Sequence, residues 1–383
     1  MKILVNAKKL APILSELSRI SPNRTTLPIL MNAKIVADVD SAMLKITATN
    51  LDMTLTRNIA AEIKEGGEIT VPIVRLNELF SVFPDQMATL QYNDKKGSLK
   101  IACAGTKADL RTISAEEFPA IGRNDNPALS LDFNAEDLAS ALREVVFAAS
   151  EDTARPILTG IMFDIREQQM ILAAADGFRL AWRTFVLPMK VAEPVKFTIL
   201  ATGVREIIKL LSGHEIATMS VWLGFDHIEF NVPDADLMVV ALNGDYPDFS
   251  PMFEKFNQEA PTKAVIPVSA LNNACRACSV IAKETNYIGK ITINPNGTEV
   301  GSVTLNALQA EIGNAEGTVD ATVTGDAIES GINIRMIQDI LSAVGNGEIA
   351  IEFRGESNPI LIKPIGRNDY FNVVMPVHVP GAA

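Results

Sequence analysis

The feature that most constrains the fold of this chain is a threefold internal repeat. A shift of 128 residues superimposes four separate segments on later ones, and a further shift of about 133 brings in a third copy: Val5–Leu10 on Phe133–Leu138, Leu27–Leu30 on Arg155–Leu158, Thr70–Phe80 on Thr198–Ile208, Phe118-Pro119 on Tyr246-Pro247, and then Leu10 and Leu138 on Leu271. We therefore predict three modules of similar structure: module 1 (residues 1–126), module 2 (127–256) and module 3 (257–383).

The hydrophobic pattern within each module predicts two helices among several strands. Leu10, Ile13, Leu14, Leu17 and Ile20 recur at helical spacing, whereas residues 44–48 alternate between apolar and polar as a half-buried strand does. Each helix has one apolar stripe, so each is expected to cover one face of a sheet. The fold class predicted is α+β with antiparallel sheets, and the helices are expected at 7–20, 73–83, 134–149, 201–212, 268–283 and 333–344.

Composition excludes several classes of protein. Apolar residues make up 48% and charged residues 21%, which is the balance of a folded globular chain and not of a disordered one. No apolar run approaches the roughly 20 residues that span a bilayer. The first residues enter a strand-like pattern directly, without a signal peptide, and three cysteines cannot build a disulfide scaffold. We expect a cytoplasmic protein.

The sequence holds no convincing catalytic or metal-binding constellation. Cys275 and Cys278 form a CxxC pair, but the repeat aligns them with Leu14 and Leu17, so we interpret them as core residues. Phosphate-binding glycine loops and nucleophile elbows are missing, only three histidines occur, and no carboxylate pair stands out as an acid–base couple. We expect a protein without catalytic residues, metal or cofactor.

Taken alone, the net charge of −12 argues against a nucleic-acid partner, but the charge is unevenly distributed. The six predicted helices carry ten basic and seven acidic side chains, so they are net positive while the rest of the chain is strongly acidic. From the residues alone, ordinary solvated helix faces are the favoured explanation. The alternative is a modestly positive helical surface set against an acidic exterior.

Five short segments carry a resemblance that covers the whole chain. They are Arg24–Leu30, Arg155–Gly160, Ala175–Ala181, Gly244–Phe249 and Val373–Val377. In order and spacing they resemble the bacterial sliding clamp family, the beta subunit of the replicative DNA polymerase.

The resemblance implies three clamp domains per chain and a head-to-tail homodimer that closes into a ring, with helices lining the hole. Double-stranded DNA would be encircled without sequence preference, so a few exchangeable phosphate contacts suffice, and an acidic exterior keeps DNA in the hole. The implied DNA contacts are Arg24, Arg75 and Arg155, although Pro156-Ile157 replace the family's aromatic pair. The implied dimer contacts are Leu110 on one edge, and Val280 and Ile281 on the other.

The resemblance also implies a pocket for short apolar peptide motifs of the polymerase alpha subunit, the clamp loader, other polymerases and repair proteins. Its residues would be Leu158, Ala175, Gly177, Phe178, Arg179, Leu180, Pro247, Met252, Pro359, Val373, Val374, Met375 and Pro376. Three features depart from the family: Phe178 replaces a histidine, His378 replaces an arginine, and Pro380–Ala383 extend the usual end.

Two other functions remain open from the residues alone. One is an enzyme acting on a small anionic metabolite through arginines such as Arg155 and Arg179, for which an acid–base set is missing. The other is a peptide-binding scaffold that never encircles DNA.

Overall fold

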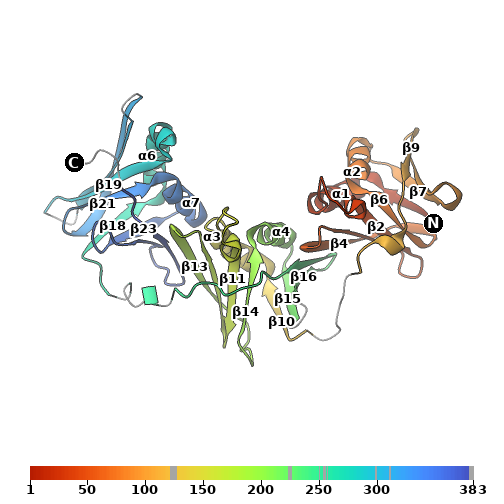
Figure 1. Cartoon of the computed structure of the whole chain (residues 1–383), viewed down its shortest axis with the longest axis horizontal. Coiled ribbons are helices and arrows are strands. Elements are labelled where there is room, and N and C mark those ends of the chain that lie inside the picture. Colours follow the sequence, from red (N-terminus) through yellow and green to blue (C-terminus); the bar gives the residue numbers. More distant parts are fainter. Residues whose placement is uncertain are drawn as a thin grey trace. The chain divides into compact units, whose positions relative to one another are not determined.

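The computed structural model describes residues 1–120, 127–222, 227–249, 251–252, 256, 258–297, 300–309 and 312–378. These residues form two compact units (Figure 1). The first comprises residues 1–136 with 209–241, and the second comprises 137–208 with 242–383. Each unit thus contains one terminal module together with part of module 2.

The three modules repeat one order of elements, apart from the additional strand β5 in module 1. Module 1 contains β1 Lys2–Asn6, α1 Ala7–Ile20, β2 Asn32–Asp38, β3 Met43–Thr49, β4 Met53–Ala60, β5 Glu62–Glu65, β6 Gly67–Pro72, α2 Ile73–Val82, β7 Met87–Asn93, β8 Ser98–Cys103 and β9 Thr106–Arg111. Module 2 contains β10 Leu129–Asn134, α3 Ala135–Val146, β11 Gly160–Arg166, β12 Gln169–Ala175, β13 Arg179–Val186, β14 Val195–Leu200, α4 Ala201–Leu211, β15 Ile216–Trp222, β16 His227–Val232 and β17 Ala235–Val240. Module 3 contains β18 Thr262–Pro267, α6 Val268–Ala282, β19 Ile288–Pro295, β20 Val300–Gln309, β21 Gly313–Gly325, β22 Ile328–Asn333, α7 Ile334–Val344, β23 Glu348–Phe353, β24 Ile360–Pro364 and β25 Tyr370–Val374.

The predicted helices are confirmed, and their ends differ from the expected ones by at most three residues. Capping side chains explain two of the starts. The Asn6 side chain accepts a hydrogen bond from the Lys9 amide, and Asn333 accepts from the amides of Arg335 and Met336. The apolar stripe of α1 is buried as predicted, and α1 and α2 lie side by side (Figure 1).

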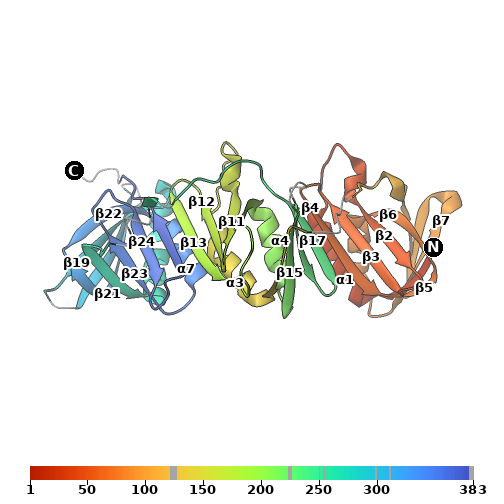
Figure 2. The ribbon, with the colours of Figure 1, turned by 90° about the horizontal axis from the view of Figure 1, so that it is seen from below.

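Strand pairing joins the modules, and it does so in the same way twice. The last strand of module 2, β17, pairs antiparallel with the fourth strand of module 1, β4. The last strand of module 3, β25, pairs antiparallel with the fourth strand of module 2, β13. We call these pairings the first and second internal joints. They create an eight-stranded sheet in the first unit and a twelve-stranded sheet in the second, and Figure 2 shows β4, β3 and β2 running side by side.

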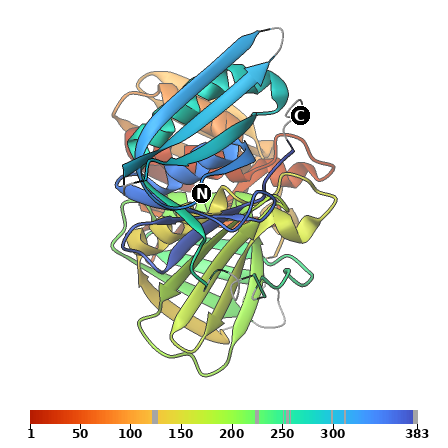
Figure 3. The same cartoon turned by 90° about the vertical axis from the view of Figure 1, so that its left-hand side faces the viewer.

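Among the described strands, β5, β6, β10, β14 and β22 lie at the ends of sheets, and two further strands, β9 and β21, keep an open edge that bears on the joints between modules. β9 pairs only with β8, at the end of a five-stranded sheet. β21 pairs with β20 along its length, but its other edge meets β18 only through residues 322–325. Figure 3 shows β20 and β21 as two long strands that run together. By element order, β9 is the last strand of module 1 and β21 is the fourth strand of module 3.

The cysteine prediction is confirmed, because Cys275 and Cys278 are fully buried in the core of module 3. Burial raises the pKa of the Cys275 thiol to about 12 and also raises the pKa of Cys278. Thiolate is the reactive form of cysteine, so both side chains act as packing groups.

Candidate functional site

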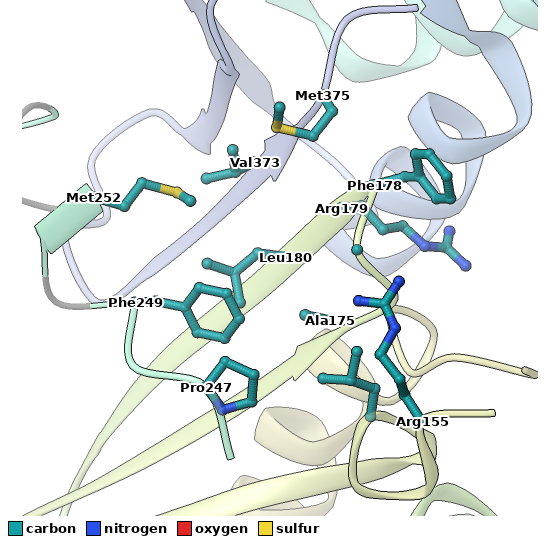
Figure 4. A pocket seen from close by; sticks show the side chains of 12 residues that line it. Arg155, Ala175, Phe178, Arg179, Leu180, Pro247, Phe249, Met252, Val373 and Met375 are labelled. Atoms are coloured by element: carbon teal, nitrogen blue, oxygen red, sulfur yellow. The ribbon is translucent and has the colours of Figure 1, made fainter. Parts of the chain in front are cut away.

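An apolar cavity of about 220 Å³ lies in the second unit, between the β12–β13 hairpin and the segment after β25 (Figure 4). The residues that line it come from four stretches far apart in the sequence: Arg155, Leu158, Ala175, Gly177, Phe178, Arg179, Leu180, Pro247, Phe249, Met252, Val373 and Met375. Cavities of this kind, mostly apolar with a few polar groups, are typical ligand sites.

The turn between β12 and β13 shapes one side of the cavity. Asp176 accepts hydrogen bonds of 2.9 Å from the amides of Phe178 and Arg179 through one carboxylate oxygen. Gly177 adopts φ +93°, a conformation that favours glycine. This turn leaves the Phe178 ring 59% exposed at the rim, while Leu180 is buried in the floor.

A buried tyrosine holds the floor. The Tyr246 hydroxyl oxygen accepts a 2.9 Å hydrogen bond from the Ala175 amide, and the ring meets Phe249 edge-on at 6.2 Å. Burial raises the pKa of Tyr246, so the hydroxyl stays protonated. The cluster around it contains Leu158, Leu180 and Val373, all largely buried. Contacts within the chain therefore fix the shape of the floor.

The two arginines beside the cavity differ in their surroundings. Arg179 points away from the apolar side chains (Figure 4) and binds Asp176 at 2.9 Å and Asp339 of α7 at 2.6 Å. Its guanidinium also lies 5.4 Å from the centre of the Phe147 ring. Arg155 is exposed and makes no ion pair with the described residues. Arg179 is thus committed to structure, whereas Arg155 is available to a ligand.

The segment after β25 forms the other rim. The Met375 amide donates a 2.7 Å hydrogen bond to the Phe178 carbonyl, and the Val377 amide donates a 2.9 Å bond to the carbonyl of Gly331 in β22. The half-buried Met375 side chain therefore faces the cavity from a fixed backbone.

Ten of the thirteen residues assigned to the pocket by resemblance line this cavity. The other three do not: Val374 is fully buried in the core of module 3, and Pro359 and Pro376 line neighbouring cavities. Sequence reasoning missed Phe249, although the Gly244–Phe249 segment was already singled out. Arg155, which the resemblance assigns to DNA, also lines this cavity.

The remaining predicted contacts lie elsewhere. Arg24 is exposed on the loop after α1, and Arg75 on α2 is exposed and forms a 2.7 Å ion pair with Glu78. Leu110 is half-buried on the edge strand β9. On α6, Val280 is 73% exposed, whereas Ile281 packs partly against the core of module 3.

The structure offers no candidate metal centre within the described ranges, since no three His, Cys, Asp or Glu side chains there are grouped to hold an ion. Among the same residues, no helix is long and apolar enough to cross a membrane.

Comparisons with known proteins agree with this architecture. Three family models match: DNA polymerase III beta subunit N-terminal domain over residues 1–122, central domain over 132–248 and C-terminal domain over 255–378. The chain belongs to the DNA polymerase III beta subunit family.

Among curated relatives, the beta sliding clamp of Synechococcus elongatus is 26% identical over 384 residues, covering 99% of this chain and 100% of the relative. That of Staphylococcus aureus is 27% identical over 372 residues and 94% of each chain.

Solved structures show the same fold. The DNA polymerase sliding clamp of Bacillus subtilis superimposes with a TM-score of 0.91 at 20% identity, over 99% of both chains. The DNA polymerase III subunit beta of Pseudomonas aeruginosa gives 0.89 at 20% identity, over 99% of this chain and all of the other.

Proposed function

We propose that this chain is the processivity factor of a replicative DNA polymerase: a sliding clamp in which two copies close a ring around duplex DNA. The clamp performs no chemistry. It tethers the polymerase and other proteins that bind its pocket, and it works in the cytoplasm. The three clamp domains are assigned to residues 1–126, 127–256 and 257–383.

The observation that carries the ring is the order of the strand joints. Both internal joints place the last strand of one module against the fourth strand of the module before it. Of the last and fourth strands that this rule pairs, two have no partner module within the chain: the last strand of module 1, β9, and the fourth strand of module 3, β21. With a second copy, β9 of each chain can pair with β21 of the other chain, which follows the same rule at both ends. Two chains arranged head to tail then form a closed ring.

Side chains near the two open edges support this joint. Leu110 lies on β9, and the apolar Val280 is exposed on α6, which packs on β21. A large exposed apolar side chain beside an open strand edge favours a protein partner, because pairing satisfies the free backbone groups and covers the apolar surface together.

A closed ring needs only weak contacts to hold DNA. A closed ring retains the duplex by its topology, so weak contacts from exposed arginines such as Arg24 and Arg75 suffice and permit sliding. The net charge of −12 then has a role, because a mainly acidic surface repels DNA outside the hole.

The cavity supports the tethering function. Its preformed apolar floor suits a short linear motif with one or two apolar anchors, a mode in which a few residues supply most of the affinity. Phe178, where the family has a histidine, makes this rim more apolar. The predicted influence of the Pro380–Ala383 tail lies outside the described residues.

The neutralised state of Arg179 weakens the alternative of an enzyme for small anions, because two carboxylates already occupy that guanidinium. Arg155 alone would have to bind the anion.

Primer extension tests the proposed function. The purified chain, the polymerase of the same cell and its clamp loader are combined on a long primed circle, with excess trap DNA to prevent rebinding. The proposal predicts product lengths at least tenfold longer with the chain than without it. Equal lengths, with an active loader, would refute it.

A further inference from the structure

A buried arginine sits at the first internal joint between two carboxylates from different modules. Arg57 on β4 is only 12% exposed. Its Nε lies 3.4 Å from Glu16 of α1 in the same module, and its Nη2 lies 3.0 Å from Asp234, which immediately precedes β17 of the next module. His214 also approaches Asp234, at 3.7 Å.

The second internal joint has the same triad. Arg183 on β13 is 16% exposed, and its Nε lies 2.8 Å from Glu144 of α3. Its Nη1 binds Asp369, which immediately precedes β25 of module 3. Arg367 adds a second cation, donating to Glu144 and Asp369.

The two triads occupy equivalent places. Glu16 and Glu144 are separated by the repeat shift of 128, and each lies on the first helix of its module. Both arginines lie on the fourth strand, and each is a register partner of the strand that makes the joint, Arg57 of Ala235 and Arg183 of Tyr370. One glutamate–arginine–aspartate arrangement thus recurs at both places where modules meet within the chain.

The open edges of β9 and β21 lack this glutamate–arginine–aspartate arrangement. The shift of 133 places Ala277 where Glu144 stands, and α6 contains no acidic residue. β21 contains no arginine or lysine, and Gly105 precedes β9. Gly317 of β21 packs so closely on α6 that a Cβ there would lie 2.9 Å from Cβ of Ala274. An arginine at that position would be excluded by the helix.

We propose that the two triads act as a pairing code: they determine which last strand pairs with which fourth strand, so the strands at the joints of this repeated chain cannot be exchanged. This inference rests on the proposed ring. A largely buried arginine next to a strand that lacks the aspartate would keep only the glutamate of its own module and lose one of its two carboxylate partners, which is destabilising. β4 and β13 therefore reject β9, which offers Gly105. β21 has no arginine, so β17 and β25 would find no partner there for Asp234 and Asp369. β21 therefore remains free to pair with β9 of a second copy.

The code addresses a hazard built into the sequence. Three modules with the same strand order can exchange last strands between chains, and each wrong exchange yields open or mixed oligomers instead of one closed ring. Specificity of this kind depends on penalising wrong partners as much as on rewarding the right one.

The test replaces both triads with neutral side chains of similar size in the full chain: Glu16→Gln, Arg57→Met, Asp234→Asn, Glu144→Gln, Arg183→Met and Asp369→Asn. Replacing a whole buried ion pair by neutral groups is often tolerated, so folding is retained. Wild type, variant and control proteins are each unfolded and then refolded separately under the same conditions. The products are analysed by sedimentation velocity and native mass spectrometry. The code predicts one assembly for wild type and at least a fivefold larger mass fraction outside that assembly for the variant.

Two controls separate pairing specificity from stability. Lys34→Met with Glu68→Gln removes a 2.8 Å ion pair inside one module, and it must refold as wild type does. Arg57→Lys with Arg183→Lys keeps the positive charge at both joints, so this variant must refold to a single assembly as wild type does. A neutral variant that refolds to one assembly like wild type, whatever its melting temperature, overturns the code.

A third variant is used if the protein with all six substitutions does not fold. Glu144→Gln, Arg183→Met and Asp369→Asn alter only the second joint and predict an intermediate fraction of wrong assemblies; a single wild-type-like assembly overturns the code here too. If wild type itself is a monomer, the ring proposal fails, whereas the comparison of wild type with variants still tests the triads through intermolecular exchange.

Discussion

The backbone amide of Met375 donates a 2.7 Å hydrogen bond to the carbonyl oxygen of Phe178. This bond ties the segment after β25 to the β12–β13 turn, so the two rims of the apolar cavity are positioned by one contact. The side chains of Met375 and Phe178 both line the cavity (Figure 4). The cavity is therefore ordered before binding, which lowers the entropy that a ligand must lose.

Met375→Ala should weaken binding of a polymerase-tail peptide about tenfold or more, because a central apolar anchor in such an interface is worth about 1.4 kcal/mol or more. Fluorescence anisotropy with a labelled peptide measures the change. Met189→Ala is the matched control, since Met189 is exposed in the same unit but does not line the cavity. Equal affinity of Met375→Ala and wild type would remove Met375 from the site.

Deleting Met375–Ala383 should abolish peptide binding and leave the dimer intact. The deletion removes one rim, whereas the strand joints end at Val374. Its loss also frees the Gly331 carbonyl of β22, at the sheet edge, which water can satisfy. Peptide titration and sedimentation of the same preparation check both halves. Binding that persists in a dimeric deletion variant would contradict the assignment.

Val280→Asp should raise the dimer dissociation constant at least a hundredfold, because a buried, unpaired charge costs about 3–5 kcal/mol. Val280 is a cleaner choice than Ile281, which also packs on the core of its own module. Val186→Asp, at another exposed valine, should leave the dimer unchanged. Analytical ultracentrifugation over a dilution series decides, and a dimeric Val280→Asp variant would move the seam elsewhere.

Arg24→Ala and Arg75→Ala should each reduce the salt dependence of DNA binding. Each phosphate contact contributes about 0.9 to the slope of log K against log salt, so the double variant should lose close to two. Binding to short linear duplex across a salt series measures this without ring loading. Arg155→Ala should leave the slope unchanged and weaken peptide binding instead. A slope lost in Arg155→Ala would restore this residue to the DNA contacts.

Asp369→Asn should lower stability at neutral pH and have a smaller effect in acid. Burial tends to raise the pKa of Asp369, but the Arg367 hydrogen bond and the charges of Arg183 and Arg367 outweigh it, so the pKa lies below the usual 3.8. The stabilisation is therefore present above pH 3.8 and is lost as the pH falls through the lower folded value. Solvent screening of this 41% exposed carboxylate limits it to about 1 kcal/mol. Urea unfolding at pH 7 and pH 3 should give a smaller difference from wild type at pH 3 than at pH 7; an equal difference at both would mean that charge is not involved.

Repetition made much of the fold predictable. The shifts of 128 and 133 residues located helices in copies where the pattern alone was weaker, and together they assigned Cys275 and Cys278 to the core by alignment with leucines. Local periodicity decides such elements because each helix buries one stripe on its own module.

The details of the cavity depend on contacts that sequence spacing does not encode. Val374 and Val373 are adjacent in one strand, so they point to opposite faces, and only Val373 reaches the cavity. Phe249 enters because the Tyr246 hydroxyl fixes the preceding segment beneath Ala175. The triads of Arg57 and Arg183 were likewise invisible, because each unites three distant stretches of chain.

The central claim is that two copies trap DNA inside a closed ring, and retention on circular DNA tests it most directly. The protein is loaded onto nicked circular duplex, free protein is removed, and half the sample is linearised with a restriction enzyme. The ring predicts that protein stays on the circle for many minutes and leaves the linear molecule by sliding off its ends. Equal loss from circular and linear DNA would contradict the ring, whatever the peptide pocket binds.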